Sequence, residues 1–195
     1  MQFAKQVLLL LLVASLVAAC GGPSTNPDAI ASSPPPAGSC GTFCSSLRRV
    51  GREVLVLPDG SGGYEFSCLT TPNMNPSDGK VSNGRWMVTL EYRDAEENGR
   101  HLQISESNAL GLAVSPVGNW KGSVTGDVTV QGTSRAKFEK WLSADGKGKD
   151  FCSISWRKDG VSILMTLDGC DMSISEMADL ADHLVSASEA IEACK

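Results

Sequence analysis

Apolar and polar residues alternate with a period of two along most of the chain after residue 40, and this alternation predicts β-strands. The pattern is clearest near the C-terminus, where Asp150–Arg157 and Val161–Leu167 are joined through Asp159-Gly160, a dipeptide typical of tight hairpin turns. The residues that face one another in this register are all apolar: Trp156 with Ile163, Ile154 with Met165, and Cys152 with Leu167. A shift of one residue would move these side chains to the polar face, so the sequence specifies a single register.

Shorter runs of the same kind predict a small helix and several strands further upstream. The helix is expected around Thr42–Val50, and the strands at Glu53–Leu57, Tyr64–Leu69, Arg85–Tyr92, His101–Ser105, Gly111–Val114 and Asp127–Gln131. The first two strands flank the turn-rich segment Pro58–Gly63 and are expected to form a hairpin. Arg135–Leu142 fits both a strand and a helix, and we favour a strand.

A single amphipathic helix is expected to close the chain, from Ile174 to about Ala193. Ser173 with Glu176 three residues later matches a capping box at its start. The apolar stripe of this helix needs a partner, and the apolar face of the preceding hairpin is the nearest one. The predicted fold is therefore α+β: a curved antiparallel β-sheet with a C-terminal α-helix packed on one face.

The N-terminus carries a different pattern, in which Lys5 precedes an apolar run from Val7 to Ala19. This run is too short for a bilayer, which needs ~20 apolar residues. It ends in Val17-Ala18-Ala19-Cys20, which resembles the lipobox of bacterial lipoproteins. The resemblance implies that residues 1–19 are a lipoprotein signal peptide, cleaved before Cys20, and that Cys20 receives a thioether-linked diacylglycerol. The alternative is an ordinary secretory signal peptide, which would leave Cys20 as one more thiol.

Residues 20–39 are expected to be the lipidated cysteine and a Pro/Ser/Gly-rich tether, since they hold five of the nine prolines and few apolar side chains. Such a segment averages roughly 25 Å end to end as a coil and about 60 Å as polyproline helix. The lipoprotein resemblance implies a lipid anchor on the extracytoplasmic face of the cell membrane or the outer membrane. In a bacterium with two membranes, the sorting rule of that family implies the outer membrane, because Gly21 rather than Asp follows the cysteine.

Residues 40–195 are expected to form a single extracytoplasmic α+β domain, stabilised by disulfides. Its cysteines are Cys40, Cys44, Cys68, Cys152, Cys170 and Cys194. An even number in an exported domain predicts three disulfides, with free thiols and a metal site as the alternatives. No C-x-x-C motif is present, and neither His101 nor His183 has a cysteine at ligand spacing, so we expect no metal and no other cofactor.

The expected packing of the C-terminal helix along the final hairpin limits which cysteines can form disulfides with one another. Cys152 and Cys170 lie at the same end of the final hairpin, whereas a helix of roughly 30 Å would carry Cys194 to the opposite end. Because a disulfide tolerates only ~4.4–6.8 Å between Cα atoms, Cys152–Cys170 is the preferred pair and Cys152–Cys194 is disfavoured. Cys194 is then expected to pair with one of the three remaining cysteines, Cys40, Cys44 or Cys68.

The segment Trp156–Val161 followed by Ser173–Leu184 resembles a bacterial extracytoplasmic domain family of unknown function. Members of that family occur at the C-terminal ends of anti-sigma-like and other membrane-tethered proteins. The resemblance covers about the last seventy residues. It implies a hairpin closed by a helix and suggests sensing or interaction, and it supplies no catalytic residue.

The sequence contains few motifs typical of catalysis or ligand binding. Asp59-Gly60-Ser61-Gly62-Gly63 has the wrong order for the G-D-S-G-G of chymotrypsin-like proteases, and a hydrolase also needs a histidine base with an orienting acid. Phosphate-binding loop motifs are missing from the sequence. The net charge is −5 and the charges are dispersed, which gives no reason to expect nucleic acid as a partner.

Trp120 lies in a polar, glycine-containing stretch and is a candidate contact for a partner; the alternative is that it covers a sheet edge. These observations predict a membrane-anchored, non-enzymatic binding or sensing module, whose partner is an envelope protein or an apolar ligand. A carrier of lipid or another apolar molecule is the alternative, and a hydrolase is third. A tunnel lined by Trp86, Val88 and Leu90 would favour the carrier, whereas a filled core would favour the binding module.

Overall fold

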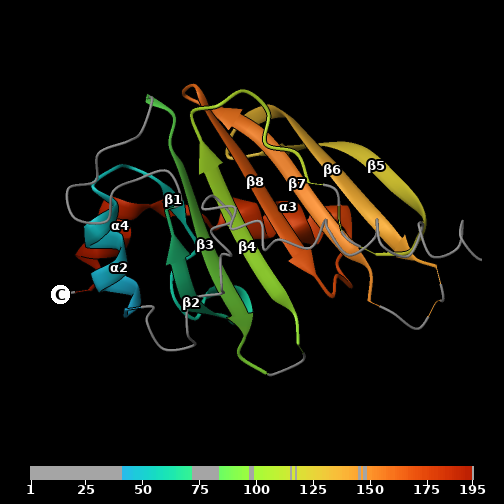
Figure 1. Ribbon diagram of the computed structural model, residues 1–195, viewed down its shortest axis with the longest axis horizontal. Coiled ribbons are helices and arrows are strands. Elements are labelled where there is room, and N and C mark those ends of the chain that lie inside the picture. The colour runs from blue at the N-terminus through green and yellow to red at the C-terminus, as the bar shows by residue number, and fades with distance from the viewer. Residues whose placement is uncertain are drawn as a thin grey trace, which may run out of the picture. The chain divides into compact units, whose positions relative to one another are not determined.

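Seven antiparallel strands form the main sheet, in the order β2-β3-β4-β8-β7-β6-β5 (Figure 1). The computed structural model describes residues 41–71, 84–96, 99–114, 116, 118–144, 146 and 149–194. The strands are β2 (Tyr64–Thr70), β3 (Met87–Asp94), β4 (His101–Ser107), β5 (Trp120–Val130), β6 (Thr133–Ser143), β7 (Phe151–Lys158) and β8 (Val161–Asp168). Two runs of consecutive hairpins, β2 to β4 and β5 to β8, meet where β4 pairs with β8.

The final hairpin has the predicted register. Cys152 faces Leu167, Ile154 faces Met165 and Trp156 faces Ile163. The ambiguous segment Arg135–Leu142 lies within β6, as we favoured.

Two strand predictions need correction. The strand expected at Asp127–Gln131 is the end of the much longer β5, which starts at Trp120. The strand expected at Gly111–Val114 is wrong, because that segment has no strand structure. Both edges of the preceding strand β4 are already paired, with β3 and β8, so the chain that follows finds no neighbouring edge there.

The predicted hairpin between Glu53–Leu57 and Tyr64–Leu69 is also wrong. The first segment contributes β1 (Leu55–Val56), which pairs with β9 (Val185–Ser186) near the C-terminus. Side chains of the main sheet hold β1 in place. The Leu55 N–H donates to Glu106 Oε1 at 2.5 Å, and the Leu57 N–H donates to the Tyr92 hydroxyl at 3.1 Å.

Among the described residues, three α-helices accompany the sheets: α2 (Phe43–Val50), α3 (Ile174–Asp182) and α4 (Ala187–Glu192). The single long C-terminal helix is therefore wrong. A second capping serine explains the break, because Ser186 Oγ accepts from the Glu189 N–H at 3.2 Å and starts a new helix. The capping box of Ser173 and Glu176 at the start of α3 is confirmed.

The core lies between one face of the sheet and the helices. In Figure 1, α3 lies behind the sheet, while α2 and α4 lie together beside β1. Met177 and Ala181 of α3 are fully buried in the same apolar cluster as the sheet residues. The opposite face of the sheet carries small polar side chains such as Ser153 and Thr166. The described residues thus form an α+β fold that is mostly antiparallel sheet.

Two disulfides join described residues. Cys152–Cys170 has a Cα–Cα distance of 5.6 Å, as predicted, and Cys194 pairs with Cys44 at 6.1 Å, one of its three expected partners. Cys68 is disulfide-bonded as well, while Cys20 and Cys40 lie outside the described residues. The disulfides point to an oxidising, extracytoplasmic compartment. None of the described helices has the length and apolar character needed to cross a membrane.

Candidate functional site

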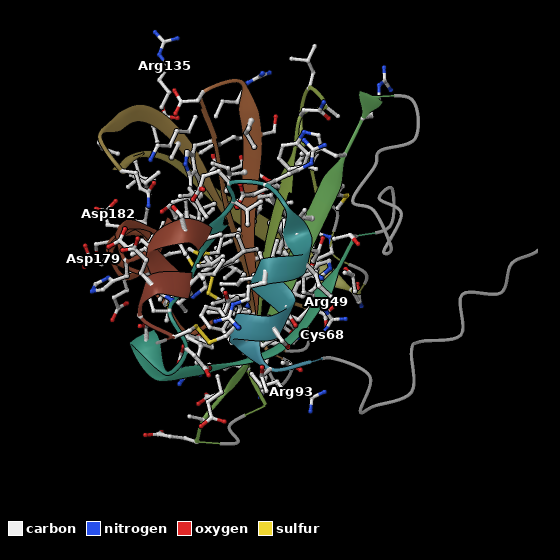
Figure 2. All side chains as sticks on the ribbon, turned by 90° about the vertical axis from the view of Figure 1, so that its left-hand side faces the viewer. Arg49, Cys68, Arg93, Arg135, Asp179 and Asp182 are labelled. Atoms are coloured by element: carbon white, nitrogen blue, oxygen red, sulfur yellow. A yellow bond between two sulfur atoms is a disulfide. The ribbon has the colours of Figure 1, made fainter. Side chains whose placement is uncertain are left out.

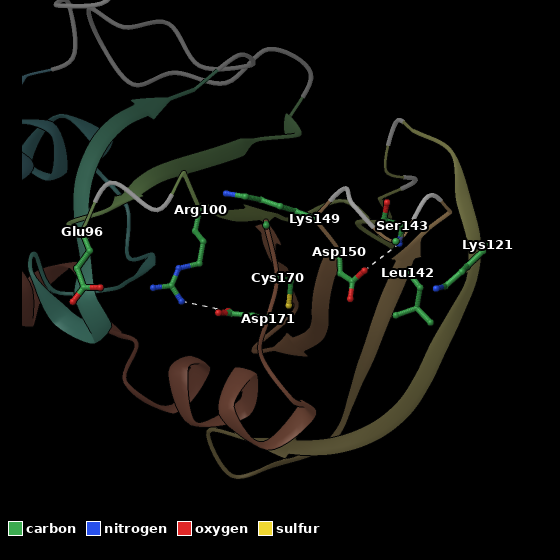
Figure 3. A pocket seen from close by; sticks show the side chains of 11 residues that line it. Glu96, Arg100, Lys121, Leu142, Ser143, Lys149, Asp150, Cys170 and Asp171 are labelled. Carbon is green, nitrogen blue, oxygen red and sulfur yellow. Dashed lines mark hydrogen bonds and ion pairs between the residues drawn. The ribbon is translucent and has the colours of Figure 1, made fainter.

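A charged recess of about 860 Å³ lies at one end of the sheet, where three connections converge (Figure 3). These connections follow β3, join β6 to β7 and lead from β8 into α3. The recess is lined by Glu96, Arg100, Lys121, Leu142, Ser143, Gly146, Lys149, Asp150, Gly169, Cys170 and Asp171. Six of these side chains are ionisable and charged, which makes the recess polar rather than apolar.

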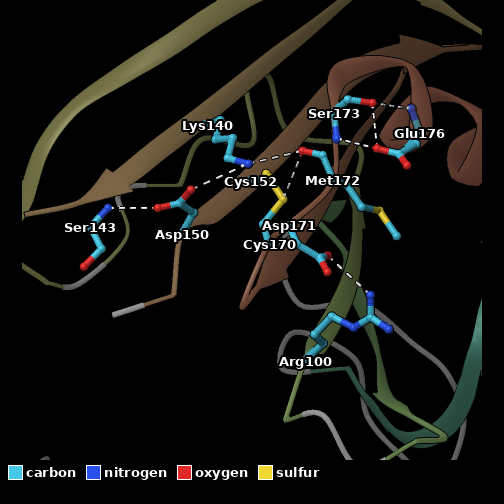
Figure 4. The surroundings of a disulfide bond; sticks show 10 residues. All are labelled: Arg100, Lys140, Ser143, Asp150, Cys152, Cys170, Asp171, Met172, Ser173 and Glu176. Carbon is cyan, nitrogen blue, oxygen red and sulfur yellow. Dashed lines mark hydrogen bonds and ion pairs between the residues drawn. A yellow bond between two sulfur atoms is a disulfide. The ribbon is translucent and has the colours of Figure 1, made fainter. Parts of the chain in front are cut away.

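The Cys152–Cys170 disulfide fixes the floor of the recess (Figure 4). The Cys170 N–H also donates to the Asp150 carbonyl at 2.7 Å, which ties the connection after β8 to the start of β7. Gly169, which lies between the end of β8 and Cys170, has a φ of +78°. A Cβ at this position would lie 3.0 Å from Lys149 Cδ. A glycine is therefore required both by the backbone conformation and by the close approach of Lys149.

Arg100 connects two acidic side chains on one wall of the recess. Its Nε contacts Asp94 Oδ2 at 2.5 Å, and its Nη1 contacts Asp171 Oδ1 at 3.3 Å. The Asp94 side chain is only 2% exposed, so this part of the network is shielded from water. The hydrogen bond to Asp94 raises the pKa of Arg100 further above its ordinary value. The guanidinium is thus held in one position, with Asp171 at the edge of the recess.

Asp150 plays the corresponding part on the other wall (Figure 4). Its Oδ1 accepts from the Ser143 N–H at 3.0 Å, and its Oδ2 lies 3.6 Å from Lys140 Nζ. Lys140 in turn donates to the Met172 carbonyl at 3.4 Å. Lys121 completes this side from β5 and is exposed. Acidic and basic side chains are therefore mixed around the recess.

Trp120, the predicted partner contact, lies next to Lys121 and is half-buried. Its ring is 6.4 Å from that of Phe151, which lies 5.6 Å from the Trp141 ring. The Trp120 indole N–H donates to the Pro116 carbonyl at 3.1 Å. The Trp120 ring thus packs against an aromatic side chain of β7. Its contact with a partner stays a prediction.

The hydrolase-like elements do not come together in the described part of the chain. Asp59 Oδ1 accepts from the Phe66 N–H at 2.8 Å, which is a turn contact. His101 lies 3.7 Å from Glu91, and His183 Nδ1 contacts the Asp179 carbonyl at 2.6 Å. Among the residues described, no three His, Cys, Asp or Glu side chains are grouped as metal ligands would be.

Sequence reasoning missed Glu106, a carboxyl group on the core side of β4. The residue is 2% exposed, and burial raises its pKa to about 8. A signal was present, because Glu106 continues the apolar phase set by Leu102 and Ile104. The recess residues were missed for a different reason, since they come from separate connections that only the sheet order brings together.

No protein-family model matches this sequence, and no curated protein or solved structure matches it either. The lipobox resemblance at Cys20 stays an expectation, because that residue lies outside the described part of the chain. Any function has to be inferred from sequence patterns and from the geometry of the described residues.

Proposed function

We propose that this protein is a membrane-anchored extracytoplasmic lipoprotein whose folded domain is a non-enzymatic binding or sensing module. The charged recess is its binding surface. The observation that carries this proposal is that a polar cavity of about 860 Å³ is framed by fixed ion pairs and by the Cys152–Cys170 disulfide. A surface that is already ordered loses little conformational entropy when a partner binds.

The charges of the recess favour a polar partner, such as the charged surface of an envelope protein. Arg100, Lys121 and Lys149 stand among Glu96, Asp150 and Asp171, so the lining offers both signs of charge. A surface with both signs of charge favours a partner with the complementary pattern. It disfavours partners that would bring like charges together. An apolar ligand would find few contacts here.

The packing of the core supports the binding module over a lipid carrier. Val88 and Leu90 are fully buried, and Trp86 is nearly so, in the cluster that the sheet forms with the helices. A tunnel along this face would need those side chains to line an open space. Curvature of the sheet around α3 is part of the proposed architecture, since Gly126 of the edge strand β5 lies against Ile174 of α3.

The anchor is tested by metabolic labelling with palmitate in the bacterium that produces the protein. The Cys20→Ala variant should incorporate no label and should stay unprocessed or be released by another peptidase. The Cys40→Ala variant is the matched control, because it removes the next thiol along the chain and should still be labelled. Label on the Cys20→Ala protein would refute the lipoprotein assignment.

The recess is tested by placing a photo-crosslinking amino acid at Lys121 in the full chain and irradiating living cells. A discrete cross-linked species is expected from this position. Leu110 is the control position, since it is 83% exposed and does not line the recess. Equal products from both positions, or none from Lys121, would contradict the proposed site. Lipid that co-purifies in equimolar amount with the Cys20→Ala chain would instead support the carrier.

A further inference from the structure

A second, smaller pocket of about 390 Å³ lies at the opposite end of strands β6, β7 and β8. The recess lies where β6 ends and β7 begins, whereas this pocket lies near the start of β6 and the turn between β7 and β8. Three basic side chains line it, Arg135, Lys137 and Arg157, together with the hydroxyl residues Ser155 and Ser162. None of the described residues that line it is acidic.

The strand register places these side chains on one face of the sheet. Lys137 pairs with Ser155, and Arg157 pairs with Ser162. Arg135 is two residues from Lys137 on β6 and therefore points to the same side. This is the face opposite the apolar core, to which the intervening residues Ala136, Ile154 and Trp156 belong. The cluster is thus a direct consequence of the alternation within three adjacent strands.

The cations of this pocket keep most of their donors for a ligand. Arg135 forms no hydrogen bond or ion pair with any described residue, and Figure 2 shows it at the outer limit of the molecule. Arg157 uses Nη2 to bind the Gly160 carbonyl at 3.0 Å, and its other guanidinium donors remain. Lys137 contacts Glu139, which does not line the pocket.

The arrangement is unusual for this chain, whose net charge is −5. Like charges held near one another repel and oppose folding, so stability does not explain a pocket with three cations, of which Lys137 alone pairs with an acidic residue among those described. The hydroxyl groups add neutral donors. The Ser155 side chain forms no hydrogen bond with any described residue, while Ser162 Oγ donates to the Ala109 carbonyl at 2.9 Å and holds the wall formed by residues 111 and 112.

We propose that this pocket is a binding site for a phosphate group, either free or carried by a lipid headgroup. Arg135 and Arg157 provide forked donors suited to phosphate oxygens, Lys137 provides a point charge, and Ser155 provides a neutral hydrogen bond. The proposal is independent of the function assigned to the recess, because the two cavities share no lining residue.

Calorimetric titration of the full chain in a neutral detergent tests the site with two probes. Inorganic phosphate represents the free anion, and dihexanoyl-phosphatidylglycerol represents the headgroup, with dihexanoylglycerol as the control that lacks the phosphate. Saturable binding of either anionic probe is expected, and the probe that binds more tightly identifies the source. Arg135→Gln should weaken that binding about tenfold. Lys121→Gln in the recess removes the same charge and should leave the affinity within twofold.

Ser155→Ala separates a built site from general electrostatic attraction, because it changes no charge. A loss of about threefold in affinity is expected from one neutral hydrogen bond. The proposal is overturned if neither anionic probe binds, or if Arg135→Gln and Lys121→Gln weaken binding equally. It is also overturned if dihexanoylglycerol, which has no phosphate, binds as tightly as phosphatidylglycerol while phosphate does not bind.

Discussion

The two ends of strands β6, β7 and β8 differ in how their charged side chains are paired. At the recess, acidic and basic side chains pair with one another, as Arg100 does with Asp94 and Asp171, and Lys140 with Asp150. At the basic pocket, no acidic side chain is in the lining, and of Arg135, Lys137 and Arg157 only Lys137 pairs with a described acidic residue, Glu139. Paired charges hold turns in place, whereas unneutralised like charges oppose folding. The charges at the recess therefore stabilise the fold, whereas the basic pocket has cations available for a ligand.

The buried carboxyl groups at these ends differ in the same way. Asp94 near the recess has the Arg100 guanidinium at 2.5 Å. Glu106, at the level of the basic pocket but on the core face, has no cation within salt-bridge distance among the described residues, and the Leu55 N–H donates to it. Burial without a positive partner raises the pKa of Glu106 to about 8. The following experiments test this difference between the two ends.

The largest effect is expected from Glu106→Gln, measured as the free energy of unfolding between pH 5 and 9. The folded-state pKa of about 8 lies above the ordinary value of 4.5, so the wild type should lose stability as the pH rises through this window. The neutral variant keeps an acceptor for Leu55 and lacks that loss. At pH 9 it should exceed the wild type by roughly 4 kcal/mol, while the two should be similar at pH 5.

The other charges near Glu106 shift its pKa in both directions and do not reverse this effect. Glu53 raises the pKa of Glu106 and Lys158 lowers it, both less than burial does. Glu192→Gln on the exposed side of α4 is the control and should show the same pH dependence as the wild type. If the free energy of unfolding of Glu106→Gln had the same pH dependence as that of the wild type, this carboxyl would not be held protonated.

The next effect concerns the disulfide at the recess. Replacing both Cys152 and Cys170 by alanine should lower the free energy of unfolding by about 3 kcal/mol, because the closed loop spans 18 residues. Under conditions in which the variant remains folded, phosphate affinity at the other end should stay unchanged, while cross-linking from Lys121 should fall. Loss of phosphate binding in the folded variant would mean that the two ends do not act separately.

Much of the fold was predictable from local patterns. The register of the last hairpin follows from its apolar pairs and its Asp-Gly turn, and the Cys152–Cys170 bond follows from that hairpin. The pairing of β1 with β9 was not predictable in this way, since it joins segments from the two ends of the domain. Ser186 with Glu189 repeats the capping pattern of Ser173 with Glu176, and this signal was present but overlooked.

The sites were less predictable than the fold for the same physical reason. Arg135 and Arg157 read as ordinary solvent-facing positions of separate strands, and only the order β8-β7-β6 places them together. Arg100 and Asp171 are likewise far apart in sequence and meet through the pairing of β4 with β8. A sequence shows which face a side chain occupies, whereas the sheet order decides which faces adjoin.

A smaller difference in the free energy of unfolding is expected between two arginine substitutions. Arg100→Met should lower the free energy of unfolding by about 2 kcal/mol, because the buried Asp94 loses its guanidinium partner. Arg135→Met should change it by less than about 0.5 kcal/mol, as is usual for an exposed side chain without partners. Urea denaturation at pH 7 measures both. Equal losses from the two variants would contradict the assignment of structural charge to one end only.

The smallest effect compares a glycine at each end. Gly169 and Gly160 both have positive φ, +78° and +82°, so alanine at either position should cost about 1 kcal/mol of backbone strain. At Gly160 nothing lies within 4 Å of an added Cβ, whereas at Gly169 the Cβ would meet Lys149 Cδ at 3.0 Å and Arg100 Cγ at 3.4 Å. Gly169→Ala should therefore be less stable than Gly160→Ala by about a further 1 kcal/mol, because the recess wall has to shift. Thermal unfolding of the two variants side by side measures this difference. If Gly160→Ala proved equally or more destabilising, the close packing that we assign to the recess would not be what holds it together.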